Sequence, residues 1–181
     1  MSQDDNLLNL TKSHLNIGLR GIPVGTCRTS FVTPESGVHY CGYPISELAD
    51  SKPEDIVYLL FNKELPTPEQ SDAFTKELQS RGAVPPEVNS ILATLPRDGH
   101  PMDWLSIGIH TLGMLCLENN WKEDALNLVA KMPRLLGLIF RYRENRVDDI
   151  PADDLSKNLV ERFTDTLDFE GVDRDAMNKI L

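Results

Sequence analysis

The sequence predicts a mainly α-helical protein, a helical bundle that carries one small antiparallel β-hairpin near its N-terminus. Three observations predict this fold class. Only residues 26–43 combine β-favouring runs with a turn sequence. The chain after residue 50 repeats helix-start signals followed by apolar residues at helical spacing. The third observation is length, because 181 residues are enough for one domain with a substantial apolar core.

Composition and charge narrow the class of protein. The chain has 40% hydrophobic and 25% charged residues, and its net charge is -10 with a pI of about 4.8. This acidity argues against a nucleic-acid binder, since a protein that binds phosphates needs a basic face. The longest apolar run, residues 112–117, is too short to cross a membrane. We therefore expect neither nucleic acid nor membrane as a partner.

The cysteines and the N-terminal stretch indicate a location. Three widely spaced cysteines show neither metal-ligand spacing nor a disulfide framework, which favours a reducing compartment. The opening MSQDDNLLNLTK has neither the apolar core of a signal peptide nor the Arg-rich pattern of a transit peptide. We therefore expect a cytoplasmic protein. Residues 1–17 are predicted to form a flexible leader.

The only predicted β structure lies between residues 26 and 43. Two β-favouring runs, TSFV at 29–32 and VHYCGY at 38–43, flank the sequence Pro-Glu-Ser-Gly at 34–37. A proline and a glycine between such runs are typical of a hairpin turn.

Helix-start signals then follow in order. Residues 51–54 (SKPE) and 67–70 (TPEQ) each place a hydroxyl three residues before Glu or Gln, which is the pattern of a capping box. Gly82 is expected to end the second of these helices in a left-handed conformation. A further helix starts at Pro86, with apolar residues on one face. These residues are Val88, Ile91, Leu92 and Leu95.

Two longer helices are expected next. The first opens at His100 and runs to Leu117, and its two interior glycines, Gly108 and Gly113, predict close approach of a neighbouring element. The second follows Asn120 and ends near Arg141, Arg143 and Arg146, where positive charge complements the helix dipole. Its apolar stripe is predicted to contain Ala125, Leu128, Val129, Met132, Leu135, Leu136, Ile139 and Phe140.

The end of the chain predicts two more helices after an acidic loop at 148–154. One helix carries Leu155, Leu159, Phe163 and Leu167. The other is short and begins at Asp173, with Met177, Ile180 and Leu181 on its apolar face. Since no closing turn follows Leu181, we expect the chain to be cut inside that helix.

Several of these segments occur together, in the same order, in one enzyme family. They are GLRG (18–21), the hairpin, YCGYPISELA (40–49), YLLFNKELPTPEQ (58–70), HPMD (100–103) and FRYR (140–143). Over nearly all of residues 18–181 the chain resembles citrate synthases and the similar 2-methylcitrate synthases. Cys41 is a departure, since the family commonly has Arg before Gly-Tyr. The resemblance implies that residues 18–181 are the N-terminal part of a large, almost wholly helical domain that works as a homodimer.

The resemblance also implies a reaction. Such enzymes condense acetyl-CoA with oxaloacetate to citrate and CoA, using an Asp that removes a methyl proton and His and Arg residues that hold oxaloacetate and stabilise the enol. Their His-x-Asp-His and Gly-Pro-x-His-Gly segments are missing from the 181 residues, and matching the C-terminal stretch places Leu181 just before the first of them. We therefore expect no catalytic residue and no bound cofactor in this chain, and no activity by the chain alone. A coenzyme A thioester is the substrate of the complete enzyme.

Arg20 is the one residue to which the resemblance assigns a binding role. The family's GLRG-like element places an arginine near the phosphates of CoA, and a guanidinium suits phosphate oxygens. The alternative is an ordinary surface arginine beside a glycine-rich turn.

The other candidates have structural explanations. His100 is expected to cap a helix, and His110 to be a core or interface histidine. The aspartates 148, 149, 153 and 154 lack the spacing of a calcium loop and are expected to form a solvated loop and a helix cap. Cys27 and Cys116 are expected to be unreactive. No metal site can be assembled from the sequence.

Three readings of function stay open. In the first, the chain is part of a citrate synthase-like enzyme that a C-terminal part completes, or part of a 2-methylcitrate synthase. In the second, the chain is a truncated, non-catalytic paralogue that acts as a dimerisation module, since helices 101–117 and 121–140 belong by resemblance to the dimer interface. The remaining reading is an unrelated helical binding domain whose motifs match by chance.

Overall fold

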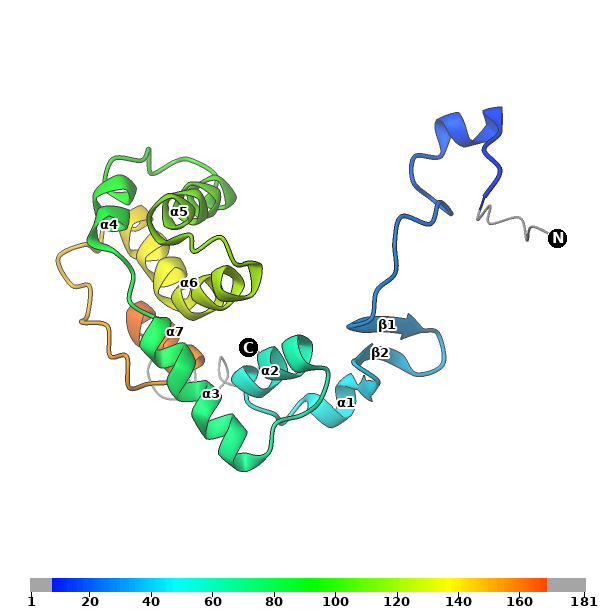
Figure 1. The fold of residues 1–181 in the computed structure, drawn as a ribbon. Coiled ribbons are helices and arrows are strands. Elements are labelled where there is room, and N and C mark those ends of the chain that lie inside the picture. Colours follow the sequence, from blue (N-terminus) through cyan, green and yellow to red (C-terminus); the bar gives the residue numbers. More distant parts are fainter. Residues whose placement is uncertain (1–7, 169–181) are drawn as a thin grey trace.

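The structure is a computed structural model that describes residues 8–168, so the helix predicted from Asp173 lies outside the described residues. Within residues 8–168 there are one 3-10 helix, three strands and seven α-helices, arranged as Figure 1 shows. Their bounds are η1 Lys12–Asn16, β1 Ser30–Thr33, β2 Gly37–Tyr40, β3 Tyr43–Pro44, α1 Ile45–Leu48, α2 Pro53–Asn62, α3 Pro68–Arg81, α4 Pro86–Leu92, α5 Pro101–Cys116, α6 Trp121–Arg143 and α7 Leu159–Leu167. The mainly helical prediction is confirmed.

The predicted hairpin forms, and a third strand extends it. β1 and β2 pair antiparallel with Ser30 opposite Tyr40 and Thr33 opposite Gly37. The short β3 then pairs with β2 through a turn at Cys41 and Gly42, whose φ angles are 51° and 97°. The sequence did not predict β3, because a two-residue strand has no periodicity to detect.

One predicted capping box is confirmed and the other is wrong. Thr67 caps α3 by accepting a hydrogen bond from the Gln70 backbone N–H, and the Gln70 side chain accepts from the Thr67 N–H. At α2 the N-cap is Lys52, and it makes no side-chain cap bond. The Glu54 side chain, which the box requires, is buried and accepts a 2.8 Å hydrogen bond from the backbone N–H of Leu159. Glu54 thus accepts from the backbone of α7 and not from the N–H of Ser51, which the predicted box would require.

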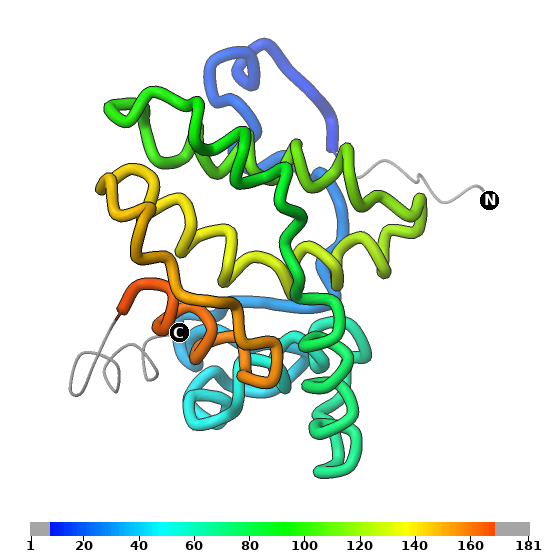
Figure 2. The backbone as a smooth tube through the Cα atoms, turned by 90° about the vertical axis from the view of Figure 1, so that its left-hand side faces the viewer, coloured from blue at the N-terminus to red at the C-terminus, as the bar shows by residue number. Residues whose placement is uncertain are grey.

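Helices α2 to α7 pack together into what we call the helical body. Helix α6 lies at its centre, where it packs against α3, α4, α5 and α7 (Figures 1 and 2). The larger apolar cluster consists of Val88, Leu92, Trp104, Leu112, Leu135, Leu138 and Ile139. The predicted stripe of α6 is only partly right. Leu126, Ala130 and Leu138 are buried outside the predicted set, whereas Phe140 within it is 41% exposed. Neighbours on several sides widen the buried face beyond one stripe.

Close packing explains one of the two glycines of α5. A Cβ on Gly108 would lie 2.8 Å from Leu135 Cδ1 of α6, so this glycine does mark a tight approach. Gly113 has no such neighbour, because the nearest atom is Leu117 Cδ1 at 3.8 Å. Gly82 is not a left-handed cap, since its φ is -73°. Its missing side chain leaves room for the guanidinium of Arg162.

The last described helix starts later than predicted. The Asn158 side chain caps α7 by accepting a 2.9 Å hydrogen bond from the Glu161 N–H, and the Glu161 carboxylate accepts a hydrogen bond from the Asn158 N–H. Leu155 therefore precedes the helix, and the aspartates of the acidic loop do not cap it.

The segment before the sheet, residues 8–28, differs from the rest. It contains η1 and an otherwise irregular chain that leads away from the helical body (Figure 1), and we call this segment the N-terminal arm. Gly18 and Gly21 within it have positive φ angles of 61° and 74°. Within residues 8–168, no helix has the length and apolar character needed to span a membrane.

Candidate functional site

Arg20 lies on the exposed side of the N-terminal arm. The two glycines that flank its turn, Gly18 and Gly21, adopt left-handed conformations, and the Arg20 N–H is bonded to the carbonyl of Ile17 at 3.3 Å. Among the described residues, no hydrogen bond or ion pair holds its guanidinium. The side chain is therefore presented to solvent at the end of a turn, and an anion could reach it.

The four histidines serve local structure or lie on the surface. His100 caps α5, because its Nδ1 accepts from the Met102 N–H at 3.2 Å, as predicted. His39 stacks on Phe31 with ring centroids 4.4 Å apart, and its Nδ1–H donates to the Gly37 carbonyl. His110 is exposed, so the core alternative for it is wrong. Residues 8–168 contain no cluster of His, Cys, Asp and Glu that could hold a metal ion.

A buried arginine joins three parts of the helical body. Arg162 of α7 has a side chain that is 1% exposed, and its guanidinium donates to both carboxylate oxygens of Asp153 at 3.0 and 2.8 Å. It also donates to the carbonyls of Ala130 and Gly82, each at 2.9 Å. All three guanidinium nitrogens thus donate hydrogen bonds inside the fold. The prediction of a solvated acidic loop is wrong for Asp153, which neutralises this charge.

The arginines at the end of α6 are also structural. Arg141 is 2% exposed and its Nε donates to the Thr166 carbonyl at 2.6 Å. Arg143 donates to the Gly99 carbonyl at 3.1 Å, and Arg146 pairs with Asp168 at 3.3 Å. Rather than only ending a helix, the cluster connects α6 to α7 and to the loop before α5.

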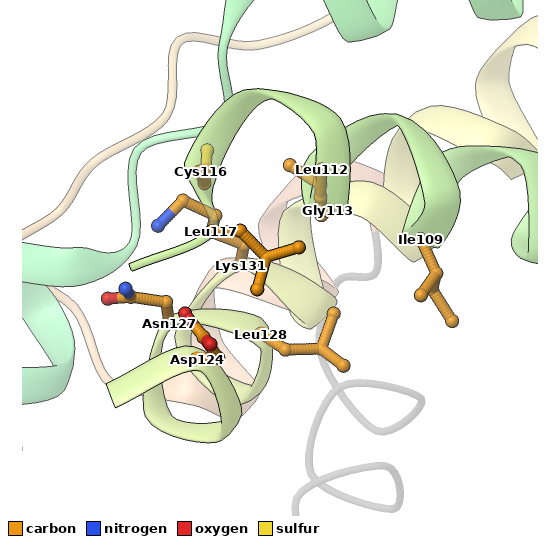
Figure 3. A pocket seen from close by; sticks show the side chains of 9 residues that line it. All are labelled: Ile109, Leu112, Gly113, Cys116, Leu117, Asp124, Asn127, Leu128 and Lys131. Carbon is orange, nitrogen blue, oxygen red and sulfur yellow. The ribbon is translucent and has the colours of Figure 1, made fainter. Parts of the chain in front are cut away.

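A cavity of about 150 Å³ lies between the end of α5 and the start of α6 (Figure 3). The polar side chains that line the cavity already form hydrogen bonds within the protein. Asn127 accepts from Arg81 and donates to Glu118, each at 3.0 Å, and Asp124 accepts from the Glu118 N–H at 2.7 Å. Lys131 donates to the Arg81 carbonyl at 2.6 Å, and burial lowers its pKa. Because these groups bond one another, the cavity offers an external ligand mainly its apolar wall.

Two apolar surfaces remain uncovered. A groove of about 330 Å³ between α6 and α7 has an entirely apolar lining, which includes Val129, Met132, Leu136, Leu159 and Phe163.

The second surface runs along α5 and into the start of α6. Met114, Leu117 and Trp121 are 78%, 59% and 70% exposed. Met114 follows Ile107 and the exposed His110 at helical spacing on one face of α5, whereas Leu117 is the residue after α5 and Trp121 is the first residue of α6. We call this the α5 face. An apolar patch of this kind marks an interaction surface more often than free solvent-facing surface.

Cys27 has surroundings that the sequence analysis did not anticipate. Its thiol is exposed, and the hydroxyls of Thr29 and Ser30, each 3.5 Å from Sγ, lower its pKa to about 6. A thiol with this pKa is mostly thiolate at neutral pH, so Cys27 is a candidate for reaction with an oxidant or alkylating agent, contrary to the expectation from the sequence. The neighbouring hydroxyls in Thr-Cys-Arg-Thr-Ser were the available signal.

Comparison with known proteins decides the family. The family model described as citrate synthase, C-terminal domain, matches residues 18–181. The chain belongs to the citrate synthase family. Among its relatives, citrate synthase 4, mitochondrial, of Arabidopsis thaliana is 30% identical over 169 residues, which are 80% of this chain and 36% of the relative. The 2-methylcitrate synthase of Shewanella oneidensis is 33% identical over 144 residues, or 76% of this chain and 38% of the relative.

The fold comparison agrees with this assignment. The crystal structure of citrate synthase from Thermotoga maritima matches with a TM-score of 0.76 at 22% identity, covering 90% of this chain and 44% of that one. The predicted helical fold of the citrate synthase-like chain is thereby confirmed. The chain spans 36% and 38% of the length of the two relatives named above, so the activity of a complete enzyme is a matter for proposal.

Proposed function

We propose that this chain supplies scaffold and one substrate contact to a citrate synthase-type enzyme that condenses acetyl-CoA with oxaloacetate, forming citrate and CoA. The family match over residues 18–181 is the observation that carries the proposal. Residues 18–181 act as the N-terminal part of the large domain. The groups that abstract the methyl proton and hold oxaloacetate lie in segments that the 181 residues do not contain.

Arg20 is the proposed contact to the CoA phosphates. Its side chain is exposed on the N-terminal arm, and the positive φ angles of Gly18 and Gly21 shape the turn that presents it. A guanidinium binds phosphate oxygens with two parallel hydrogen bonds, which a lysine cannot do.

A thiol-release assay with oxaloacetate tests the proposal. The pure 181-residue chain is expected to release no CoA, and activity is expected after mixing with a C-terminal part taken from the Thermotoga maritima enzyme. Turnover by the chain alone would contradict the assignment of the catalytic groups to other segments. Running acetyl-CoA and propionyl-CoA in parallel separates the citrate from the 2-methylcitrate reading.

The complemented enzyme also tests Arg20. Losing a charge-assisted hydrogen bond costs about 1.5–3 kcal/mol, so Arg20→Ala is expected to raise KM for the CoA thioester by roughly 10- to 100-fold. Arg28→Ala is the matched control, because Arg28 is an exposed arginine of the same arm. Equal KM values for the two variants would remove the proposed role.

A dimerisation module is the second candidate function, and the α5 face favours it. The proposed partner is a second copy of the chain, or the complementing C-terminal part. Light scattering is expected to show a dimer, and Met114→Glu is expected to dissociate it, whereas Leu65→Glu, on the loop between α2 and α3, leaves it intact. A monomer at every concentration, together with normal complementation, would argue against this candidate.

For location we propose the cytoplasm, on the cysteine usage and the acidic N-terminal stretch. The relatives include proteins named as mitochondrial and peroxisomal. Fractionation of cells that express the tagged chain tests the proposal, and recovery with mitochondria would overturn it.

A further inference from the structure

Two of the three cysteines lie at the base of the hairpin, on either side of Thr29. Cys27 precedes β1, and its Sγ is 3.5 Å from the Thr29 hydroxyl oxygen. Cys41 directly follows β2, and its Sγ is 3.7 Å from the Thr29 carbonyl oxygen. Both sulfurs therefore contact the same residue, one through its side chain and the other through its backbone.

Cys41 is held in place by the fold. It continues the β1–β2 ladder, because its N–H donates to the Thr29 carbonyl at 2.8 Å. Its φ of 51° is a left-handed conformation that few non-glycine residues adopt. Its thiol also lies 3.5 Å from the Leu59 carbonyl of α2. The position of this sulfur is thus determined by three separate backbone segments.

Cys27, in contrast, lies on exposed chain. Residues 23–28 are exposed and belong to no helix or strand. A disulfide requires Cα atoms within about 7 Å of each other. Any movement of the chain that this requirement demands can come from the exposed segment 23–28. Adjustment here breaks no packed contact of the helical body.

We propose that Cys27 and Cys41 form a reversible disulfide that ties the N-terminal arm to the hairpin when a peroxide oxidises Cys27. The Cys27 thiolate attacks one peroxide oxygen, and an S–O bond forms as the O–O bond breaks. Hydroxide is the leaving group, and Cys27 becomes a sulfenic acid. The Cys41 sulfur then attacks the Cys27 sulfur, the S–S bond forms as the S–O bond breaks, and the Cys41 proton leaves with the hydroxide as water. Two thiols and one hydrogen peroxide give one disulfide and two waters.

The order of the two steps follows from the surroundings of each thiol. Cys27 is exposed to the oxidant, and the hydroxyls of Thr29 and Ser30 stabilise its thiolate and lower its pKa to about 6. Cys41 is half-buried and serves as the resolving thiol. Cys116 lies at the end of α5 in the helical body, so it serves as an internal control. The inference does not depend on the proposed CoA contact.

Peptide mapping of the full chain tests the proposal. The chain is treated with hydrogen peroxide, alkylated and cut with trypsin without reduction. Trypsin cuts after Arg28, inside the loop that the disulfide closes, so residues 21–28 and 29–63 are expected as one linked species that dithiothreitol separates. An effective concentration in the mM range favours this pairing over intermolecular pairing by about 100-fold at about 10 µM protein.

Variants separate the pair from other oxidation products. Cys116→Ser is expected to give the linked species in full yield, and Cys41→Ser and Cys27→Ser to give none. In Cys41→Ser the Cys27 sulfenic acid is expected to proceed to the sulfinic acid or to an intermolecular dimer. If the wild type gives those same products in the same yield as Cys41→Ser, the proposal is wrong. Cys27→Ser keeps the test valid should Cys41→Ser fail to fold, because Cys27 is exposed and its sulfur contacts only neighbouring hydroxyls.

Discussion

The helical body and the N-terminal arm differ in how their charged and reactive side chains are placed. In the body, charged side chains such as Arg162 and Arg141 are buried and donate hydrogen bonds to other elements. In the arm, Arg20 and Cys27 are exposed. We infer that the charged groups of the body stabilise the fold, whereas the groups that a ligand or reagent can reach lie where the fold is least packed.

Removing the buried guanidinium is expected to have the largest effect. Arg162→Ala leaves Asp153 without its partner and removes one donor from each of two carbonyls, which costs about 3–5 kcal/mol of unfolding free energy. Urea unfolding followed by circular dichroism measures the loss. Arg20→Ala in the arm is the counterpart, with an expected change of less than about 0.5 kcal/mol. Comparable losses in both variants would contradict the division between body and arm.

Two glycines of the body separate packing from helix propensity. A Cβ on Gly137 of α6 would overlap Thr166 of α7, a buried and branched side chain, so Gly137→Ala is expected to cost about 1–3 kcal/mol. Gly113→Ala has room and is expected to stabilise by about 0.4–1 kcal/mol. Thermal unfolding of the two variants should move in opposite directions. A loss of stability in Gly113→Ala would mean that α5 is packed more tightly than its open surroundings indicate.

Glu54 tests the connection between α2 and α7. Glu54→Ala leaves the Leu159 N–H without its acceptor, and an unsatisfied buried donor costs about 1–3 kcal/mol. We expect a value near the lower end, because water can reach a helix N-terminus. Glu64→Ala, at an exposed position after α2, is the control and should be nearly neutral in the same urea titration. No difference between the two would show that the bond adds nothing to stability.

Changes around Cys27 in the arm are expected to affect stability least. Their effect is measured instead on the reactivity of the Cys27 thiol. The pKa of Cys27 is lowered to about 6, so its thiolate persists above that pH and is lost as the pH falls through it. The rate of alkylation by iodoacetamide should therefore have its midpoint near pH 6. In Thr29→Val/Ser30→Ala, which removes both hydroxyls, the midpoint should rise toward the ordinary value of 9.0. Mass spectrometry of the Cys27 peptide measures both, and an unmoved midpoint would rule out the hydroxyls as the cause.

Local signals in the sequence were dependable where one residue and its near neighbours complete the interaction. Thr67 and His100 cap their helices with backbone groups two or three residues away, and the hairpin turn lies between its own strands. The family followed from the order of short motifs. Arg20 could be singled out only by resemblance, since nothing in its local chemistry distinguishes it from Arg28.

Signals failed where a distant residue competes for the same atom. Glu54 pairs with Leu159 in place of the local cap, although 105 positions separate the two. Gly82 accommodates Arg162 instead of ending α3 in a left-handed turn.

The helical class, the starts of most helices and the family could all be predicted from the sequence. The buried charges, the tightly packed glycines and the residue that both thiols contact became clear from the tertiary structure. Helix starts and turns depend on hydrogen bonds between near neighbours, whereas burial and pairing depend on contacts between segments far apart in the chain. Cys27 and Cys41 illustrate this, since Cys27 reaches Thr29 as a near neighbour in the sequence, whereas only the register of the hairpin brings Cys41 to the same residue.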